Sequence, residues 1–286
     1  MTVKCFNPSC GNTTPLRCSR CKGVNFCGKE CQEKIWPSHK HLCKAIAKDP
    51  NATCLLLDGM GCLGPGGFYA EGVTDALVGA GVKVTTINLY KGDYLPDQVA
   101  SVLNELDRYT SCIILGWGSG DAEIETAFAN NEKFKKTIIS WVRKGGRFIV
   151  QGERPKVRGN WPKWFGKEWK QGDYCRTDYF CFANSDSDPH WANWYHQAKG
   201  ALTNTNGRYN AKAVLLKNVD VEDVLFGTTE DSSTYSLVPQ MRGRDVEEGQ
   251  CAVAHGKYGD GSVSFFGDVN AEQETCRIMS IIASGH

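Results

Sequence analysis

The chain lacks the features of a membrane or secreted protein. No apolar run approaches the roughly 18 residues that a membrane-spanning helix needs. The first ten residues contain no apolar stretch of the signal-peptide type. We therefore expect an intracellular protein, in the cytoplasm or the nucleus, that is not secreted, has no membrane partner, and keeps its thiols reduced.

The chain also lacks an excess of charge of one sign. Its 33 Lys and Arg residues almost balance its 32 Asp and Glu residues, so the net charge is +1. Residues 1–49 hold nine basic and three acidic residues, a net of +6, which leaves −5 for the rest. There is no sustained stripe of Lys and Arg, so we do not expect nucleic acid to be a partner.

Cysteine is abundant, and it is concentrated near the N-terminus. Seven of the 14 cysteines lie within residues 5–43. A reducing compartment does not maintain a disulfide framework, so this density indicates bound metal. Together with one histidine the cysteines form four pairs, and each pair is separated by two to four residues, which lets both side chains reach one tetrahedral ion. The eight candidate ligands are Cys5, Cys10, Cys18, Cys21, Cys27, Cys31, His39 and Cys43.

Eight ligands make two closed sites without an open position for water, which is typical of structural Zn²⁺ rather than catalytic Zn²⁺. The spacing predicts two zinc ions but leaves open whether the pairs are used sequentially or interleaved. A segment of about 40 residues cannot build an adequate hydrophobic core by itself. We therefore expect zinc binding to supply much of its folding free energy.

The marker positions of this segment resemble the MYND-type zinc finger. They are Cys18-x2-Cys21, Phe26-Cys27-x3-Cys31-Gln32 and Trp36-x2-His39-Lys40-x2-Cys43. The resemblance covers residues 5–43 and places a finger module at about residues 1–46. It implies that the first and third pairs share one ion, and that the second and fourth pairs share the other. The implied ligands are Cys5, Cys10, Cys27 and Cys31 for zinc 1, and Cys18, Cys21, His39 and Cys43 for zinc 2.

The same resemblance implies a protein partner, because MYND fingers recognise short proline-containing peptides. Gln32 and Trp36 are then the candidate partner-binding residues. Trp36 could instead pack the small interior of the finger, and both roles can hold together. We take His41 to be a surface residue, since the family spacing selects His39 as the ligand.

Residues 52–286 show a different pattern, in which short apolar runs alternate with helical stretches. Strands are expected at 54–58, 82–89, 111–115 and 147–150, with helices at 70–79, 97–106 and 134–143. Further strands at 211–216, 251–255 and 262–266 precede a helix at 271–283. This alternation predicts an α/β domain with a mostly parallel sheet.

The alternation is interrupted by an aromatic-rich insertion at about residues 155–210. Five of the eight tryptophans lie in it: Trp161, Trp164, Trp169, Trp191 and Trp194. These side chains could cap an edge of the sheet as a satellite hydrophobic cluster, or they could form a lid over a pocket at the strand ends. We favour the cap.

The α/β region resembles the class I glutamine amidotransferase-like fold, which has a flavodoxin-like sheet. Residues 142–150 resemble the helix and strand before the nucleophile elbow of that family, and residues 266–272 resemble its C-terminal segment. Two stretches of this region, Trp164-Phe165-Gly166 with Gly172-Asp173-Tyr174 and Gly267-Asp268-Val269-Asn270-x-Glu272, are also similar to those of fungal MYND proteins of unassigned activity. Glu153 stands where the family has its cysteine and Asn270 where it has its histidine, while Glu272 is retained. Without the thiolate and the imidazole the nucleophile is not activated, so we expect a pseudoenzyme.

Polar residues nevertheless follow several of the expected strands, where open α/β sheets bind ligands. This favours, as an alternative, an enzyme or a small-ligand sensor at the carboxyl ends of the strands. A small molecule is then a possible partner, although the carboxylates could equally serve as structural pairs with Arg154 or Arg176. The candidate pocket residues are Asp58, Gly118, Asp121, Glu153, Arg154, Asp268, Asn270 and Glu272. The chain lacks the Asn-His-Ser-Cys stretch of SET-domain lysine methyltransferases, so we do not expect that activity.

Overall fold

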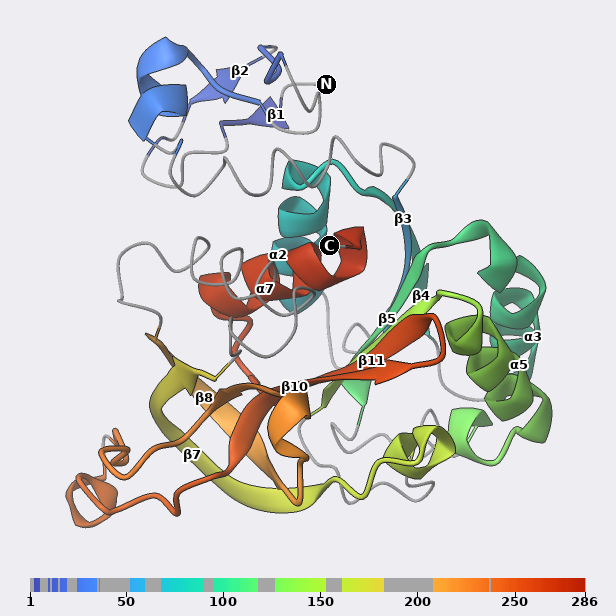
Figure 1. Cartoon of the computed structure of the whole chain (residues 1–286). Coiled ribbons are helices and arrows are strands. Elements are labelled where there is room, and N and C mark those ends of the chain that lie inside the picture. Colours follow the sequence, from blue (N-terminus) through green and yellow to red (C-terminus); the bar gives the residue numbers. More distant parts are fainter. Residues whose placement is uncertain are drawn as a thin grey trace.

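The structure of the chain is a computed structural model (Figure 1). The structure describes residues 3–5, 10, 12–14, 16–19, 25–34, 36, 52–59, 68–89, 95–117, 127–152, 161–182, 208–236 and 238–285. No helix among these residues is long and apolar enough to cross a membrane.

Five parallel strands form one part of a nine-stranded sheet, in the order β4-β3-β5-β6-β11. They are β3 (Thr53–Asp58), β4 (Lys83–Asn88), β5 (Ser111–Trp117), β6 (Arg147–Gly152) and β11 (Gly261–Phe266). Each lies where an apolar run predicted a strand. The inner strands are buried on both faces, which explains why their sequences are continuous apolar runs rather than alternating ones.

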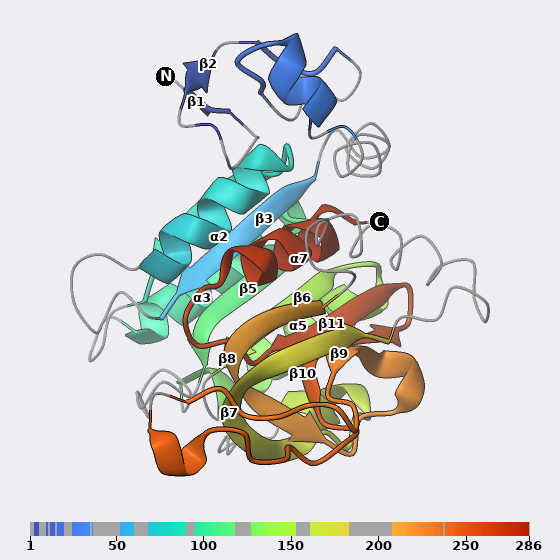
Figure 2. The ribbon, with the colours of Figure 1, turned by 90° about the vertical axis from the view of Figure 1, so that its left-hand side faces the viewer.

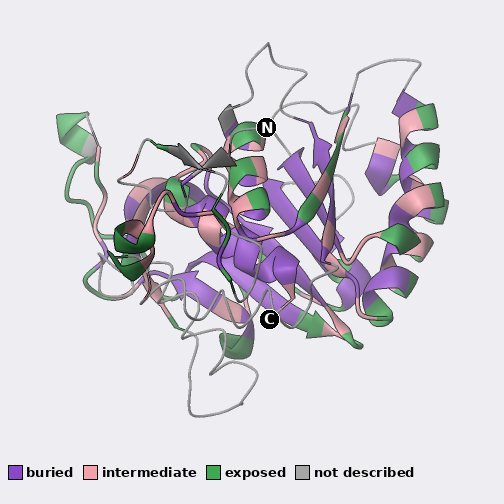
Figure 3. Ribbon diagram, turned by 90° about the horizontal axis from the view of Figure 1, so that it is seen from above, coloured by how far each residue is buried: buried purple, intermediate pink, exposed green. Residues whose placement is uncertain are grey.

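Helices cover both faces of this parallel part (Figures 1 and 2). On one face, α2 (Phe68–Gly79) and α7 (Gln273–Ser284) form one buried cluster with Cys54 and Leu56 of β3. On the other face, α3 (Leu95–Glu105) and α5 (Glu132–Arg143) form a second cluster with Leu55 and Leu57. Successive side chains of a strand point to opposite faces, so β3 alone contributes to both clusters. One buried cluster lies on each face of the sheet, and the exposed residues of the helices face away from it (Figure 3).

The other part of the sheet is antiparallel and closes on itself. It contains β7 (Lys170–Cys181), β8 (Arg208–Lys217), β9 (Val224–Gly227) and β10 (Cys251–Tyr258). The order continues from β11 through β10, β8, β7 and β9, and β9 pairs again with β10 to complete a barrel. The segment after β11 joins the closure, because the amide of Val214 donates to the carbonyl of Gly267 over 2.9 Å.

The expected mostly parallel sheet, flavodoxin-like or amidotransferase-like, is therefore wrong. Among the described strands of this sheet, four pairings are parallel and five are antiparallel. The error lies in the segment read as an insertion, which contains the longest strand, β7. Only the second half of β7 has fully buried side chains, at Thr177 and Tyr179, so its sequence gives little of the alternating signal of a half-buried strand.

The start of the same segment packs on the α3 and α5 face of the sheet, against an inner strand and not over an edge as expected. In the short 3₁₀ helix η4 (Trp161–Phe165), the Trp161 side chain is 1% exposed. Its ring lies 5.9 Å from that of Phe148 in β6, and the Trp164 ring lies 6.4 Å from that of Phe134 in α5. Trp169 is also buried. Trp191 and Trp194 lie outside the described residues.

The remaining short elements connect these parts or belong to the finger. The 3₁₀ helices are η3 (Leu106–Arg108), η5 (Val221–Asp223) and η6 (Pro239–Met241). Near the N-terminus, β1 (Val3–Lys4) pairs antiparallel with β2 (Thr13–Thr14), and residues 29–34 are helical. Three buried residues of the finger, Cys5, Cys18 and Phe26, belong to the same apolar cluster as α2 and α7.

Candidate metal centre and strand-end residues

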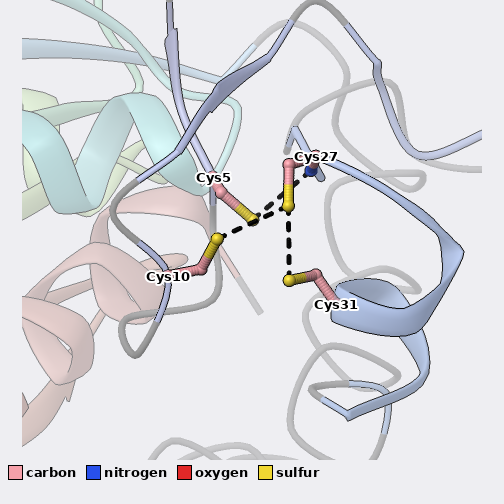
Figure 4. Close-up of side chains that lie close together, drawn as sticks. All are labelled: Cys5, Cys10, Cys27 and Cys31. Atoms are coloured by element: carbon pink, nitrogen blue, oxygen red, sulfur yellow. Dashed lines mark hydrogen bonds between the residues drawn. The ribbon is translucent and has the colours of Figure 1, made fainter.

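Four cysteines of the finger converge on one point (Figure 4). The Sγ atoms of Cys5, Cys10, Cys27 and Cys31 all lie within 4.8 Å of one another. The Cys27 sulfur is 3.4 Å from that of Cys10 and 3.3 Å from that of Cys31. Tetrahedral zinc with Zn–S bonds of about 2.3 Å would place its sulfurs roughly 3.8 Å apart. The cluster therefore has the size and the soft donor set that a structural Zn²⁺ requires.

Local structure explains how these side chains meet. Cys5 directly follows β1, and Cys31 lies on the helix that begins at residue 29. The backbone N–H of Cys27 donates to the Cys5 sulfur over 3.4 Å, which stabilises that sulfur as an acceptor. The structure thus brings together the first and third pairs of the sequence, which is the interleaved alternative and not the sequential one.

The close contacts among these sulfurs also shift the pKa values of Cys27 and Cys10. Hydrogen bonds to Cys31 and Cys10 raise the pKa of Cys27 to about 12, while a hydrogen bond from the Asn12 backbone and one with Cys27 lower the pKa of Cys10. Thiols that share protons in this way become thiolates when a divalent cation replaces those protons. A zinc ion bound here would be held by these four sulfurs.

Of the four ligands implied for zinc 2, only Cys18 lies among the described residues. Cys18 is buried, and its sulfur accepts a hydrogen bond from Nε2 of Gln32 at 4.0 Å. Trp36 is half-buried and packs against the cluster that contains Cys18 and Phe26. The other ligands proposed for this site, Cys21, His39 and Cys43, lie outside the described residues, so the second zinc stays a prediction.

The candidate pocket at the strand ends is described in part. Gly118, Asp121, Glu153 and Arg154 lie outside the described residues. Asp58 ends β3, and it lines a hollow of about 430 Å³ with Glu71, Asp75 and Thr86, between β4 and α2. Asp268 follows β11, and the sheet order places β5 and β6 between its strand and that of Asp58. The described candidates thus occupy two separate places.

Asp268 organises the turn that leads into α7. Its carboxylate accepts the backbone N–H groups of Asn270 and Glu272, both over 2.8 Å, and its carbonyl accepts from the Tyr69 hydroxyl over 2.7 Å. Burial raises the pKa of Asp268, although the two backbone hydrogen bonds oppose this shift. The Glu272 carboxylate accepts a charge-assisted hydrogen bond of 2.6 Å from Arg176. These contacts stabilise the fold at the positions where the sequence suggested chemistry.

Sequence analysis missed Gln151, a fully buried polar residue in β6. Its Oε1 accepts from the Gly116 amide over 2.8 Å, and its Nε2 donates to the Asp268 carbonyl over 2.8 Å. Gly116 has a φ of 76°, which a residue with a side chain rarely adopts. Gln151 therefore joins the carboxyl ends of three strands. The only signal in the sequence was a glutamine directly after the apolar run 148–150.

Comparisons with known proteins agree on the finger. The MYND finger family model matches residues 3–43, which confirms the N-terminal MYND zinc finger. The histone-lysine N-methyltransferase SMYD3 of Homo sapiens is 39% identical over 44 residues, or 15% of this chain and 10% of that protein. A SET and MYND domain-containing protein of Dictyostelium discoideum is 46% identical over 40 residues, 14% of this chain and 7% of that protein. The chain thus spans a tenth or less of the length of these curated relatives.

Two solved structures are similar to most of the chain, at low identity. A β-galactosidase of Bacillus circulans matches 89% of this chain and 34% of its own, with 11% identity and a TM-score of 0.44. A β-galactosidase of Rahnella sp. R3 matches 81% of this chain and 31% of its own, with 15% identity and a TM-score of 0.45. At these values the likeness assigns no activity. The resemblance of the sheet region to amidotransferases is not confirmed.

Proposed function

We propose that this chain is a zinc-dependent interaction protein whose N-terminal finger, about residues 1–46, binds a proline-containing peptide of a protein partner. The four-cysteine cluster is the observation that carries the proposal, because it gives a small segment the rigidity that a recognition surface needs. Residues 52–286 would form a second domain without catalytic function. The structural hydrogen bonds of Asp268 and Glu272 support that role.

The finger would hold two zinc ions. The first is supported by the four converging sulfurs, and the second by the spacing of the remaining ligands. Elemental analysis of the full chain, purified without chelator, should give two zinc ions per chain. Cys18→Ser should reduce this to one if the finger keeps its fold. A wild-type content of one zinc would contradict the second site.

The recognition surface would include Gln32 and Trp36. They are four residues apart, a spacing that places two side chains on one face of a helix. Trp36 is half-buried, so part of its ring remains accessible while the rest packs. An aromatic ring beside an amide suits a proline-rich segment, whose extended helix loses little entropy on binding and leaves its carbonyls free to accept hydrogen bonds.

A titration with a defined peptide tests this surface. The zinc-loaded full chain, labelled with ¹⁵N, would be titrated with a proline-containing peptide and with the same peptide carrying alanine in place of proline. We expect saturable shifts confined to the finger with the first peptide, weakened at least tenfold in Trp36→Ala. Tyr174→Ala is the control, because Tyr174 is an exposed aromatic residue of β7. Equal binding of both peptides would contradict proline recognition.

A second candidate function is that of an enzyme or small-ligand sensor, and it rests on the hollow beside Asp58. Three carboxylates and Thr86 line this hollow at the carboxyl ends of β3 and β4, where open sheets commonly bind ligands. A panel of small cationic metabolites would be screened for an increase in the melting temperature of the chain. A ligand that stabilises the wild type but not Glu71→Gln would favour this function, and an inactive panel would count against it.

A further inference from the structure

Gln32 follows a ligand of the first set and contacts Cys18, the one described member of the second set. The preceding residue, Cys31, contributes its sulfur to the four-cysteine cluster. The Gln32 side chain instead donates through Nε2 to the sulfur of Cys18, which belongs to the other set. One short helix, residues 29–34, therefore carries a ligand of the first site and a hydrogen-bond donor to a ligand of the second.

We propose that Gln32 is a positioning residue that couples the two zinc sites of the finger. This inference rests on the second zinc of the proposed function. It assigns Gln32 a contact with the metal site in addition to any contact with a partner.

The physical reason is the solvation of a buried thiolate. Cys18 is 2% exposed, so water has little access to its sulfur. Zinc occupies one lone pair of a thiolate and leaves the others to be satisfied by N–H donors. The Cys27 amide plays this part for Cys5 in the first site over 3.4 Å, and the Gln32 amide plays it for Cys18. Both contacts place an N–H donor against a sulfur that zinc would bind.

The coupling follows from the shared helix. Zinc in the first site fixes the positions of Cys27 and Cys31, and with them the start of the helix. The Gln32 amide is then already in place when the second ion binds to Cys18. The second binding step therefore does not have to order this donor, so occupation of the first site raises the affinity of the second.

Metal titration of the full chain tests the coupling. Stepwise zinc affinities would be measured by competition with a chromophoric chelator, and each site would be observed by ¹¹³Cd NMR. Gln32→Glu keeps the size of the side chain but replaces the donor with a carboxylate, and Gln32→Met removes the donor without adding charge. Glu33→Gln is the control, since Glu33 is exposed on the same helix and pairs with Lys29 over 3.5 Å.

We expect both Gln32 variants to lower the affinity for the second zinc by about tenfold or more, and to shift the ¹¹³Cd resonance of the three-cysteine, one-histidine site alone. The four-cysteine resonance and the Glu33→Gln affinities should match wild type. Two unchanged affinities in both Gln32 variants, with two ions in wild type, would overturn the coupling and leave the proposed function standing. A single ion in wild type would overturn the second site and the coupling together.

Discussion

The finger and the sheet region are stabilised by different chemistry. Among the described residues, the finger buries few apolar side chains and gathers four sulfurs at one point. The sheet region instead buries two large apolar clusters, one on each face of its parallel strands. A segment as short as the finger exposes too much of its surface to fold on apolar burial alone, whereas the longer region does not have this difficulty. Metal and apolar packing can therefore be disturbed separately.

The largest expected effect is the removal of zinc. A structural zinc contributes on the order of 10 kcal/mol to a finger, so a strong chelator, or Cys5→Ser, should unfold this segment. The sheet region should remain folded, because most of the buried residues in the cluster that it shares with the finger come from the sheet region; among the described residues, the finger contributes Cys5, Cys18 and Phe26 as buried members. Amide hydrogen exchange resolved by region would measure the unfolding of the finger and the protection of the sheet region. Simultaneous loss of protection in β3 and β5 would show that the finger is essential to the sheet.

Trp161→Ala should produce an effect of intermediate size, a loss of stability in the sheet region and not in the finger. Its ring packs against Phe148, Phe165 and Trp169, with centroids 5.9 to 6.4 Å apart. Truncating so large a buried ring typically costs about 3–5 kcal/mol, so urea unfolding of the sheet region should shift to lower concentration. Zinc content should not change. Tyr174→Ala, at a ring that is 52% exposed, is the matched control and should cost below about 1 kcal/mol.

The smallest expected effect is the pH dependence of the free energy of unfolding that Asp268 causes. Burial raises its folded-state pKa above the ordinary 3.8, so its contribution to the free energy of unfolding is complete below pH 3.8. That contribution is lost as the pH rises through the raised value. The stability of wild type minus that of Asp268→Asn should therefore fall as the pH rises through this window. Hydrogen exchange in β6 and β11 would report it, and a constant difference would contradict the raised pKa.

Sequence reasoning succeeded where the pattern was local. The cysteine spacing identified the finger, and the apolar runs located the parallel strands, because a strand buried on both faces has no polar positions to obscure it. Sequence reasoning failed where strands pair with neighbours that are distant in the sequence. β7 was read as part of an insertion, since its aromatic and charged residues resemble a loop until β8 and β9 are placed beside it. Glu272 was considered both as a pocket residue and as a structural pair with Arg176, and the structure shows the pair. The sequence did not indicate Tyr69, whose hydroxyl donates to the carbonyl of Asp268.

The closed pairing of β9 with β10 has a consequence for self-association. The nine-stranded sheet begins at β4, and within the described part of the chain no strand pairs with the outer side of β4. At its opposite end the sheet returns on itself, since β9 pairs with both β7 and β10. Sheets with two open ends can stack edge to edge without limit, which is how strand-mediated fibres grow. A sheet with one open end can join one other copy in this way, and growth then stops.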